Sequence, residues 1–257
     1  MNEVSYDAWA NIYDRTHSYL GDDLPFYLEE ALQCGGAVLE AGCGTGRVAL
    51  ALASAGMDVV GIDISKAMIS VAKDKLRKKK ELRHKVTFLQ RDMSEFKLDQ
   101  KFALIITPFR SFQALLSVAQ QRQTLESFRE HLVPSGKLII DAFVPDLEAL
   151  VNDPSVLSYL SESRDPITNE LLVTWNQSQV DTYNQILDVR HVIDVLSNDG
   201  HVNDRFYRDF QMRYIFRYEL QYLIELAGFK FENLYGDFQR TPFDEESSEQ
   251  VWVVRSP

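Results

Sequence analysis

Three glycines at alternate positions form the stretch of this sequence best suited to holding a ligand. They are Gly42, Gly44 and Gly46. They follow Glu40, which ends a short apolar run at 37–39, and a helical stretch at 47–55 comes directly after them. The run is expected to be a buried parallel strand. Glycine is needed where the chain turns with unusual dihedral angles or where a ligand lies against bare backbone. We therefore expect a ligand at the carboxyl edge of a sheet, between this strand and this helix.

The spacing of the glycines discriminates between cofactors. The dinucleotide fingerprint G-x-G-x-x-G needs its third glycine where this chain has Arg47, so a nicotinamide dehydrogenase is disfavoured. The pattern acid-x-Gly-x-Gly-x-Gly instead resembles motif I of the class I S-adenosylmethionine-dependent methyltransferases. The resemblance implies S-adenosylmethionine as cofactor and S-adenosylhomocysteine as product, with the loop around the methionine part. The residues that it assigns to this role are Glu40, Ala41, Gly42, Cys43, Gly44 and Gly46. An ordinary glycine-rich turn is the alternative.

An acid stands where the ribose hydroxyls of such a cofactor would be held. The second apolar strand, expected at 57–62, ends in Asp63, which is 21 residues past the first glycine. An acid about 20 residues past that glycine is placed to accept hydrogen bonds from ribose. The alternative role for Asp63 is to cap the next helix, but Ser65 is better placed to be that cap. Ile64 and Met68 are candidates to flank the adenine ring.

Two further segments match the family. Asp92 and Met93 follow a strand expected at 86–90, and the resemblance implies that they contact the adenine amine and ring. The opening stretch resembles a Tyr-x-x-x-Ala-x-x-Tyr-Asp pattern of small-molecule methyltransferases, matched by Tyr6, Ala10, Tyr13 and Asp14. Residues 5–33 are expected to be helical, with Pro25 starting a second helix at 26–32. The resemblance implies that such helices cover the cofactor and that Tyr6 and Tyr13 reach its methionine carboxylate or the substrate. Packing of the aromatic side chains against the main domain is the alternative.

The segment after the expected fourth strand, 102–106, reads Thr107-Pro108-Phe109-Arg110. In the family, residues here border the transferred methyl group, which assigns Thr107 to the cofactor site. Amino-methylases that act on bases carry Asn-Pro-Pro-Tyr or Asp-Pro-Pro-Tyr at this place. This chain keeps only a proline, so an exocyclic base amine is disfavoured as substrate. Arg110 is a candidate to pair with a substrate carboxylate or phosphate, or else an exposed loop arginine.

Composition narrows the class of partner. The formal net charge is −11 in 257 residues, and the isoelectric point is near 5.0. Nucleic-acid binding requires a basic face, so the acidic balance argues against it. The two cysteines, Cys34 and Cys43, form neither a disulfide framework nor a zinc pattern, which fits a reducing cytoplasm and predicts no metal site. No apolar run approaches the roughly 18 residues that a membrane helix needs, and we expect neither a membrane anchor nor a targeting segment.

Alternating strands and helices predict an α/β fold up to residue 143. Helices are expected at 66–80, 119–131 and 219–227, and further strands at 137–143, 229–235 and 250–255. The resemblance implies a Rossmann-like seven-stranded sheet with helices on both faces. Residues 1–143 and 217–257 would form this domain, with 1–33 as its helical N-terminal cover.

The segment 144–216 interrupts this alternation. It predicts a helix at 146–151 and then β-like runs at 171–180, 186–196 and 201–216, with Asp199-Gly200 as a hairpin signal. We expect an antiparallel β insert that acts as a substrate-side lid. His191 shares a face with apolar residues of the second run, where a hydrogen-bonded core histidine is the alternative to a catalytic base.

These features predict methyl transfer to a nitrogen or oxygen of a small molecule. The sulfonium methyl is already activated, so a base is needed only if the acceptor arrives protonated or is a weak nucleophile. His191, Tyr235 and Arg110 are the candidate catalytic residues, and His17 and Asp141 are further candidate bases. The chain is expected to be a monomer or a homodimer. Two alternatives stay open: a transferase that uses S-adenosylmethionine differently on the same scaffold, and a protein that binds the cofactor without catalysis.

Overall fold

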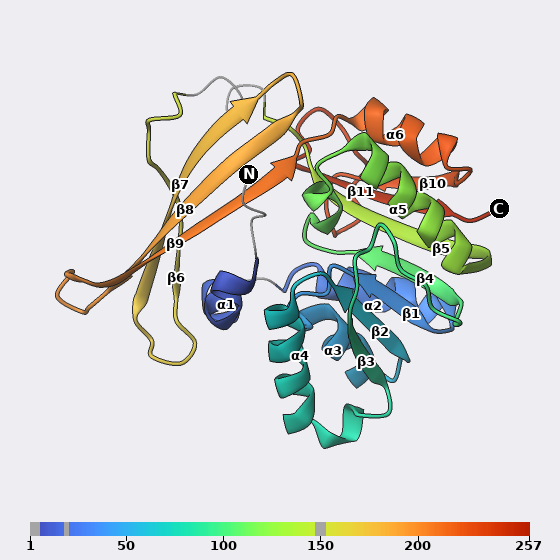
Figure 1. Ribbon diagram of the computed structural model, residues 1–257, viewed down its shortest axis with the longest axis horizontal. Coiled ribbons are helices and arrows are strands. Elements are labelled where there is room, and N and C mark those ends of the chain that lie inside the picture. The colour runs from blue at the N-terminus through green and yellow to red at the C-terminus, as the bar shows by residue number, and fades with distance from the viewer. Residues whose placement is uncertain (1–5, 18–20, 147–152) are drawn as a thin grey trace.

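Two separate sheets organise the chain (Figure 1). The computed structural model describes residues 6–17, 21–146 and 153–257. The larger sheet has seven strands in the order β10-β11-β5-β4-β1-β2-β3. Its strands are β1 (Val38–Ala41), β2 (Val59–Asp63), β3 (Val86–Gln90), β4 (Phe102–Thr107), β5 (Leu132–Phe143), β10 (Lys230–Tyr235) and β11 (Glu249–Arg255). The pairings among β1 to β5 are parallel, and β11 runs antiparallel between β10 and β5.

Helices cover both faces of this sheet. They are α2 (Leu24–Cys34), α3 (Arg47–Ser54), α4 (Lys66–Lys78), α5 (Val118–His131) and α6 (Arg217–Leu226). Successive side chains of a strand point to opposite faces. In β11, Val251 and Val253 accordingly enter a core with α2, α3 and α4, while Trp252 and Val254 enter a second core with α5 and α6. The α/β class and the seven-stranded arrangement predicted from the sequence are confirmed.

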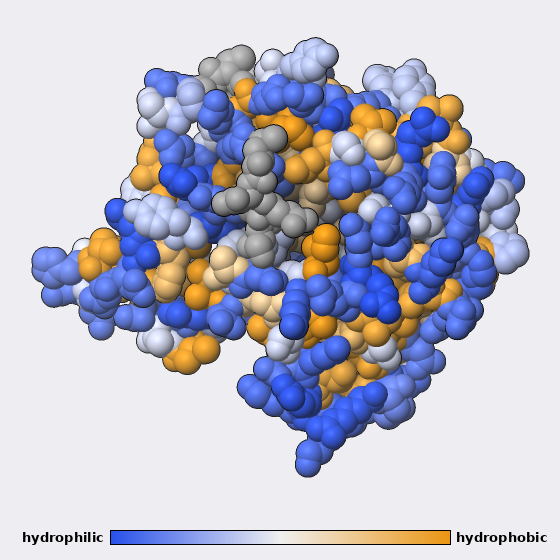
Figure 2. Space-filling view, in the orientation of Figure 1, coloured by the Kyte–Doolittle hydropathy of each residue, from blue (hydrophilic) through white to orange (hydrophobic). Residues whose placement is uncertain are grey.

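The second sheet is antiparallel and has the order β6-β7-β8-β9. Its strands are β6 (Ser158–Arg164), β7 (Leu171–Asp181), β8 (Ile186–Leu196) and β9 (Val202–Arg213). In Figure 1 it extends to the left of the larger sheet, with the short N-terminal helix α1 (Ala10–Thr16) between the two. Figure 2 shows mostly hydrophilic residues on the outside of this part, with small groups of hydrophobic ones between them.

Several element boundaries differ from the predictions for physical reasons. The N-terminal segment opens with a 3₁₀ turn, η1 (Tyr6–Trp9), before α1, and the second helix predicted from Pro25 is α2, which runs two residues further at each end. Strand β5 begins at Leu132 because a register shift against β4 accommodates Ser135, whose φ is +60°. Strand β6 was not predicted, since five of its seven residues are exposed and it lacks apolar alternation. The helix expected at 146–151 falls almost wholly outside the described residues.

Candidate active site

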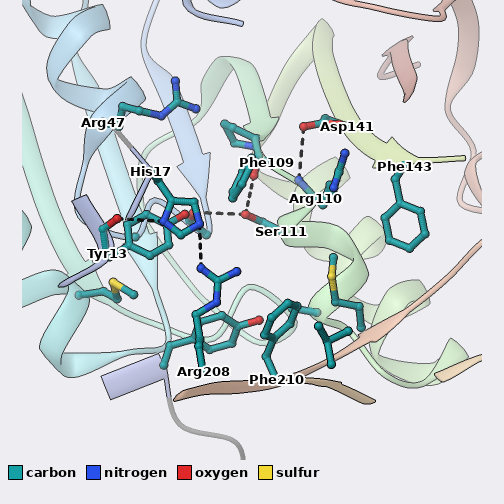
Figure 3. A pocket seen from close by; sticks show the side chains of 18 of the residues that line it. Tyr13, His17, Arg47, Phe109, Arg110, Ser111, Asp141, Phe143, Arg208 and Phe210 are labelled. Carbon is teal, nitrogen blue, oxygen red and sulfur yellow. Dashed lines mark hydrogen bonds between the residues drawn. The ribbon is translucent and has the colours of Figure 1, made fainter. Parts of the chain in front are cut away.

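A cavity of about 1030 Å³ lies where the carboxyl edge of the larger sheet, the N-terminal helical segment and one face of the second sheet meet. Figure 3 shows side chains of all three parts turned toward one another around it. The volume is at the upper limit of the usual range for small-molecule sites, about 300–1,000 Å³. The cavity therefore has room for a cofactor and a small second ligand.

The glycine loop forms one wall of the cavity and is fixed by its own backbone. Its three glycines have positive φ, which residues with a side chain rarely adopt: +78° at Gly42, +51° at Gly44 and +81° at Gly46. A Cβ on Gly42 would lie 2.5 Å from Ser111, and one on Gly46 would lie 2.6 Å from the Phe88 ring. A Cβ on Gly44 would meet nothing within 4 Å, because this glycine faces the cavity. Two of the glycines thus allow close packing, and Gly44 leaves open space.

Asp63 ties the loop to the end of β2. Its Oδ2 accepts a hydrogen bond from the Gly44 N–H at 2.8 Å, and its Oδ1 accepts one from the Ser65 N–H at 2.8 Å. Burial raises the pKa of this carboxyl, although both N–H donors lower it. Ser65 caps α4 by accepting from the Met68 N–H at 3.1 Å, so the capping role falls to the serine as predicted. Asp63 and Met68 both line the cavity, as do Ile64, Asp92 and Met93.

Aromatic rings from the N-terminal segment cover the cavity. The ring centroids of Tyr6 and Trp9 are 4.9 Å apart, those of Trp9 and Tyr13 are 5.6 Å apart, and those of Tyr13 and His17 are 4.2 Å apart. All four residues line the cavity. Burial raises the pKa of both tyrosines, so each keeps its hydroxyl proton and can donate a hydrogen bond.

Arg208 of β9 joins this N-terminal segment to the second sheet, and sequence reasoning did not identify it. Its guanidinium lies between the rings of Trp9 and Phe210, at 4.6 and 4.9 Å from their centroids, and donates to His17 Nε2 at 2.8 Å. Burial, followed by the Arg208 charge, lowers the pKa of His17 to about 3. The sequence did contain a hint of this role. Arg208 stands two residues after Phe206 and two before Phe210, so its side chain shares the apolar face of the strand, where a charged residue needs a partner.

His191 lies at the centre of the same face of the second sheet. It is paired in register with Asn176 on β7 and with Arg208 on β9, and all three line the cavity. Its ring packs edge-on against Phe210 at 5.1 Å between centroids. Burial lowers the pKa of His191 to about 3, with Arg208 as the next cause, so the imidazole is neutral at neutral pH.

The loop after β4 has unusual backbone geometry. Phe109 and Arg110 have φ of +52° and +63°, and two successive non-glycine residues in this region mark a segment held in place by its surroundings. The Arg110 N–H donates to Asp141 Oδ2 at 3.3 Å, and the guanidinium forms an ion pair with Glu249. The ion pair connects this loop, at the end of β4, to β11.

Four residues assigned from the sequence do not line the cavity. Ala41 and Thr107 are buried strand residues, and Gly46 packs against Phe88 as described. Tyr235 packs against Phe26, with ring centroids 6.1 Å apart, and its own ring lies under Arg240. In the part of the chain that the structure describes, no group of three or more potential metal ligands is assembled. No described helix is long and apolar enough to cross a membrane.

The fold and this cavity define a protein of the α/β class with a large cavity between the carboxyl edge of its main sheet and a second sheet. Residues 38–136 match the methyltransferase domain family. Over 238 residues the chain is 26% identical to a putative methyltransferase, YqeM, of Bacillus subtilis, covering 92% of this chain and 91% of that protein. It is 30% identical over 141 residues to a putative methyltransferase of a Geobacillus species, of which it spans about half, 52%.

Solved structures resemble the whole chain. The methyltransferase CcbJ from Streptomyces caelestis superposes with a TM-score of 0.79 at 23% identity, covering 99% of each chain. CalS10 from Micromonospora echinaspora, an amino pentose methyltransferase solved with S-adenosylmethionine bound, gives a TM-score of 0.72 at 16% identity over 100% of each chain. The chain therefore carries an S-adenosylmethionine-dependent methyltransferase domain, and its cofactor is S-adenosylmethionine.

Proposed function

We propose that the protein transfers the methyl group of S-adenosylmethionine to a nitrogen or oxygen atom of a small molecule held in the cavity. The observation that carries this proposal is that two separate groups of residues line the two sides of the cavity, at the carboxyl edge of the sheet. The glycine loop, Asp63 and Asp92 stand at the ends of β1, β2 and β3, which are neighbours on one side of the sheet. Arg110, Asp141 and Glu249 stand on the other side, at β4, β5 and β11. One side suits the cofactor and leaves the other for the acceptor.

The residues on the first side fit the cofactor. The open space at Gly44 allows a ligand to approach bare backbone. Each Asp63 oxygen has one N–H donor and keeps a lone pair for a ribose hydroxyl. Glu40 Oε2 is buried without a hydrogen-bond donor among the described residues, and burial raises the pKa of this carboxyl to about 8. Gly42, Gly44, Asp63 and Asp92 would therefore hold the cofactor, with Tyr6 and Tyr13 above it.

The protein's contribution to the reaction is then positioning. The bound cofactor supplies a methyl group on a positively charged sulfur, ready for in-line displacement. Ideal orientation of two reactants can contribute up to roughly 7–11 kcal/mol. The loop at Phe109 and Arg110 would border the acceptor, and the second sheet, with the N-terminal rings, would exclude water above it. We thus assign to residues 144–216 the role of a substrate-side lid on the domain formed by 1–143 and 217–257.

Named relatives favour nitrogen over oxygen as the acceptor atom. A Streptomyces venezuelae protein 28% identical over 151 residues is a dTDP-3-amino-3,4,6-trideoxy-α-D-glucopyranose N,N-dimethyltransferase. A similar structure is the sugar N-methyltransferase KedS8. A magnesium-protoporphyrin O-methyltransferase of Rhodobacter capsulatus matches 63 residues at 49% identity, which leaves oxygen as the second candidate.

Calorimetric titration followed by an acceptor screen tests the proposal. We expect micromolar binding of S-adenosylmethionine and none of NAD. Incubation of the loaded protein with amines and alcohols of defined mass should then give products heavier by one methyl group. Gain of a carboxymethyl or aminopropyl mass would identify the same scaffold in another reaction. Tight cofactor binding with no turnover would identify a non-catalytic binder, and binding of NAD alone would overturn the proposal.

A further inference from the structure

Two carboxyl groups meet on the acceptor side of the cavity. Asp141 is on β5 and Glu249 is on β11, and these strands are adjacent in the sheet, with Asp141 opposite Val251 and Glu249 opposite Phe143. Both residues line the cavity. Asp141 is only 3% exposed, and Figure 3 shows its carboxyl beside the Arg110 backbone. The two acids therefore form part of the cavity wall.

Each of these acids has one oxygen without a donor. Asp141 Oδ2 accepts from the Arg110 N–H, and Glu249 Oε1 meets the Arg110 guanidinium. Asp141 Oδ1 and Glu249 Oε2 are buried and meet no hydrogen-bond donor among the described residues. A buried polar atom without a partner costs about 1–3 kcal/mol, so native proteins rarely keep one without a reason. The two acids lie within hydrogen-bond reach of each other, so a proton held between them, or an N–H donor of a ligand once that proton is lost, would supply what these oxygens lack.

The electrostatics around the pair favour a cation. The described residues that line the cavity include eight carboxyl side chains but only four arginines and no lysine. Burial and the neighbouring Glu249 raise the pKa of Asp141 to about 8, with a hydrogen bond between the two acids among the causes. Asp141 therefore gives up its proton close to neutral pH, and the two carboxylates then outweigh the single guanidinium, that of Arg110, which faces them. An ammonium group can donate to that charge, whereas a carboxylate or phosphate would be repelled.

We propose that Asp141 and Glu249 together bind the acceptor nitrogen and take its proton, so that the substrate is a small molecule carrying a primary or secondary amine. This inference rests on the proposed methyl transfer. An ammonium ion entering the site while Asp141 is ionised gives one proton to that carboxylate and becomes a neutral amine. Its lone pair then forms the new C–N bond. The C–S bond breaks with its electrons to sulfur, which leaves neutral S-adenosylhomocysteine and a protonated, methylated amine.

The other bases of the cavity are poorly suited to this proton transfer. A general base works best when its pKa lies near the working pH. The pKa values of His17 and His191 are both lowered to about 3. Asp63 is tied to the backbone by two N–H groups on the cofactor side. The acid pair is the proton acceptor that combines a suitable pKa with a place on the acceptor side.

Matched pairs of amines and alcohols test the inference. The probes are dTDP-3-amino-3,6-dideoxy-α-D-glucopyranose, glycine and 2-phenylethylamine, each with its hydroxyl counterpart. Wild-type protein, Asp141→Asn and Glu249→Gln are compared by S-adenosylhomocysteine release. Asp194→Asn is the matched control, because Asp194 is a buried acid, 6% exposed, paired with Arg205 outside the cavity. Calorimetry of S-adenosylmethionine on each variant separates loss of cofactor binding from loss of acceptor chemistry.

We expect methylation of amines only, and a fall in kcat/KM of about 10²–10⁴-fold in Asp141→Asn with cofactor affinity unchanged. The fall in kcat/KM of this variant relative to wild type should become smaller as the pH rises past the pKa of the probe amine, because the amine then arrives without its proton. A merely structural role of Asp141 would not produce this pH dependence. The other charged or titratable groups that act on Asp141 are Arg110 from the loop after β4 and Tyr27 from α2. Methylation of an alcohol, or equal rates in the variants and the control, would overturn the inference and leave methyl transfer standing. Absence of turnover with every probe would count against both, and absent cofactor binding would reject the proposed function itself.

Discussion

The two sides of the cavity are built in different ways. On the cofactor side, the contact that fixes the loop joins residues 19 apart, Gly44 and Asp63, and its donor is a backbone N–H. On the acceptor side Arg110 reaches Glu249 across 139 residues, and in the cover above it Arg208 reaches His17 across 191, through side chains in both cases. A site made of consecutive segments and backbone geometry leaves a compact pattern in the sequence. A site made of distant side chains does not.

The two sides also differ in how freely their residues can be replaced by others. The turns at Gly42, Gly44 and Gly46 favour glycine because of their positive φ, and at Gly42 and Gly46 a Cβ would also collide with Ser111 or Phe88, whatever the substrate is. The face of the second sheet that carries Asn176, His191 and Arg208 sets no such backbone demand, since extended strands accept most side chains. We infer that the cofactor side specifies a common chemistry and that the acceptor side specifies the substrate. This division can be tested by changing each side separately.

The largest expected effect is on the cofactor side. Gly44→Val should weaken S-adenosylmethionine binding by about 100-fold or more, or about 2.7 kcal/mol, because its side chain would fill open space in the cavity at a residue with φ of +51°. Gly44→Ala is the control, since it adds the backbone strain with less volume. Calorimetry gives the affinity, and circular dichroism reports whether the chain stays folded. Retained affinity in the valine variant would show that no ligand approaches this backbone.

A smaller effect is expected from the acid that ties the loop to β2. Asp63→Ala should weaken S-adenosylmethionine binding by about 1–3 kcal/mol, since it removes the acceptor for the ribose hydroxyls and for two backbone N–H groups. Asp63→Asn, which keeps one carbonyl oxygen, should lose less. Titration with both S-adenosylmethionine and adenosine measures this. If Ala and wild type bind alike, the ribose is held elsewhere.

A further expected effect concerns the pH dependence of stability rather than binding, and it lies on the acceptor side. An Asp carboxyl has a pKa near 3.9 in an unfolded chain, and burial beside Glu249 raises that of Asp141 to about 8. The folded state therefore binds this proton more tightly, and its stability falls as the pH rises from about 4 to about 8. Asp141→Asn has no charge to bury, so its melting temperature should exceed that of wild type by a margin that grows over this interval and then levels off. A scan of melting temperature against pH checks it, with Asp194→Asn as control. A constant margin would mean that Asp141 is not the titrating group.

The elements whose signals are local were predicted closely. Strand β3 was predicted with the bounds that the structure has, and β8 likewise, because apolar alternation and turn residues delimit both. Strand β6 was missed because its side chains are mostly exposed and only its pairing with β7 makes it a strand. The separate helix α2 was predicted from Pro25, because proline is accepted in the first turn of a helix but interrupts a helix that precedes it.

The residues of the candidate site also fall into those that local sequence patterns predict and those that they do not. Glycine loop residues and acids that follow a strand could be placed from their spacing, and the structure brings Gly42, Gly44, Asp63 and Asp92 to the cavity. Tyr235 was placed at the mouth from its strand end, but it turns toward Phe26. Arg208 could not be assigned, because its partners Trp9 and His17 lie almost 200 residues earlier in the chain and only the folded arrangement shows them. The roles of the site residues in binding and catalysis stay predictions, which the variants described above test.

The contact between His17 and Arg208 also bears on the order in which the chain folds. Helix α1 has seven residues, and isolated helices shorter than about 12–15 residues are marginal in water. Its partners on β9 leave the ribosome about 190 residues later. The glycine loop can pair with β2 and β3 long before that. We therefore expect the first segment to be synthesised to be among the last to dock, so that the cavity gains its cover only when nearly the whole protein has been made.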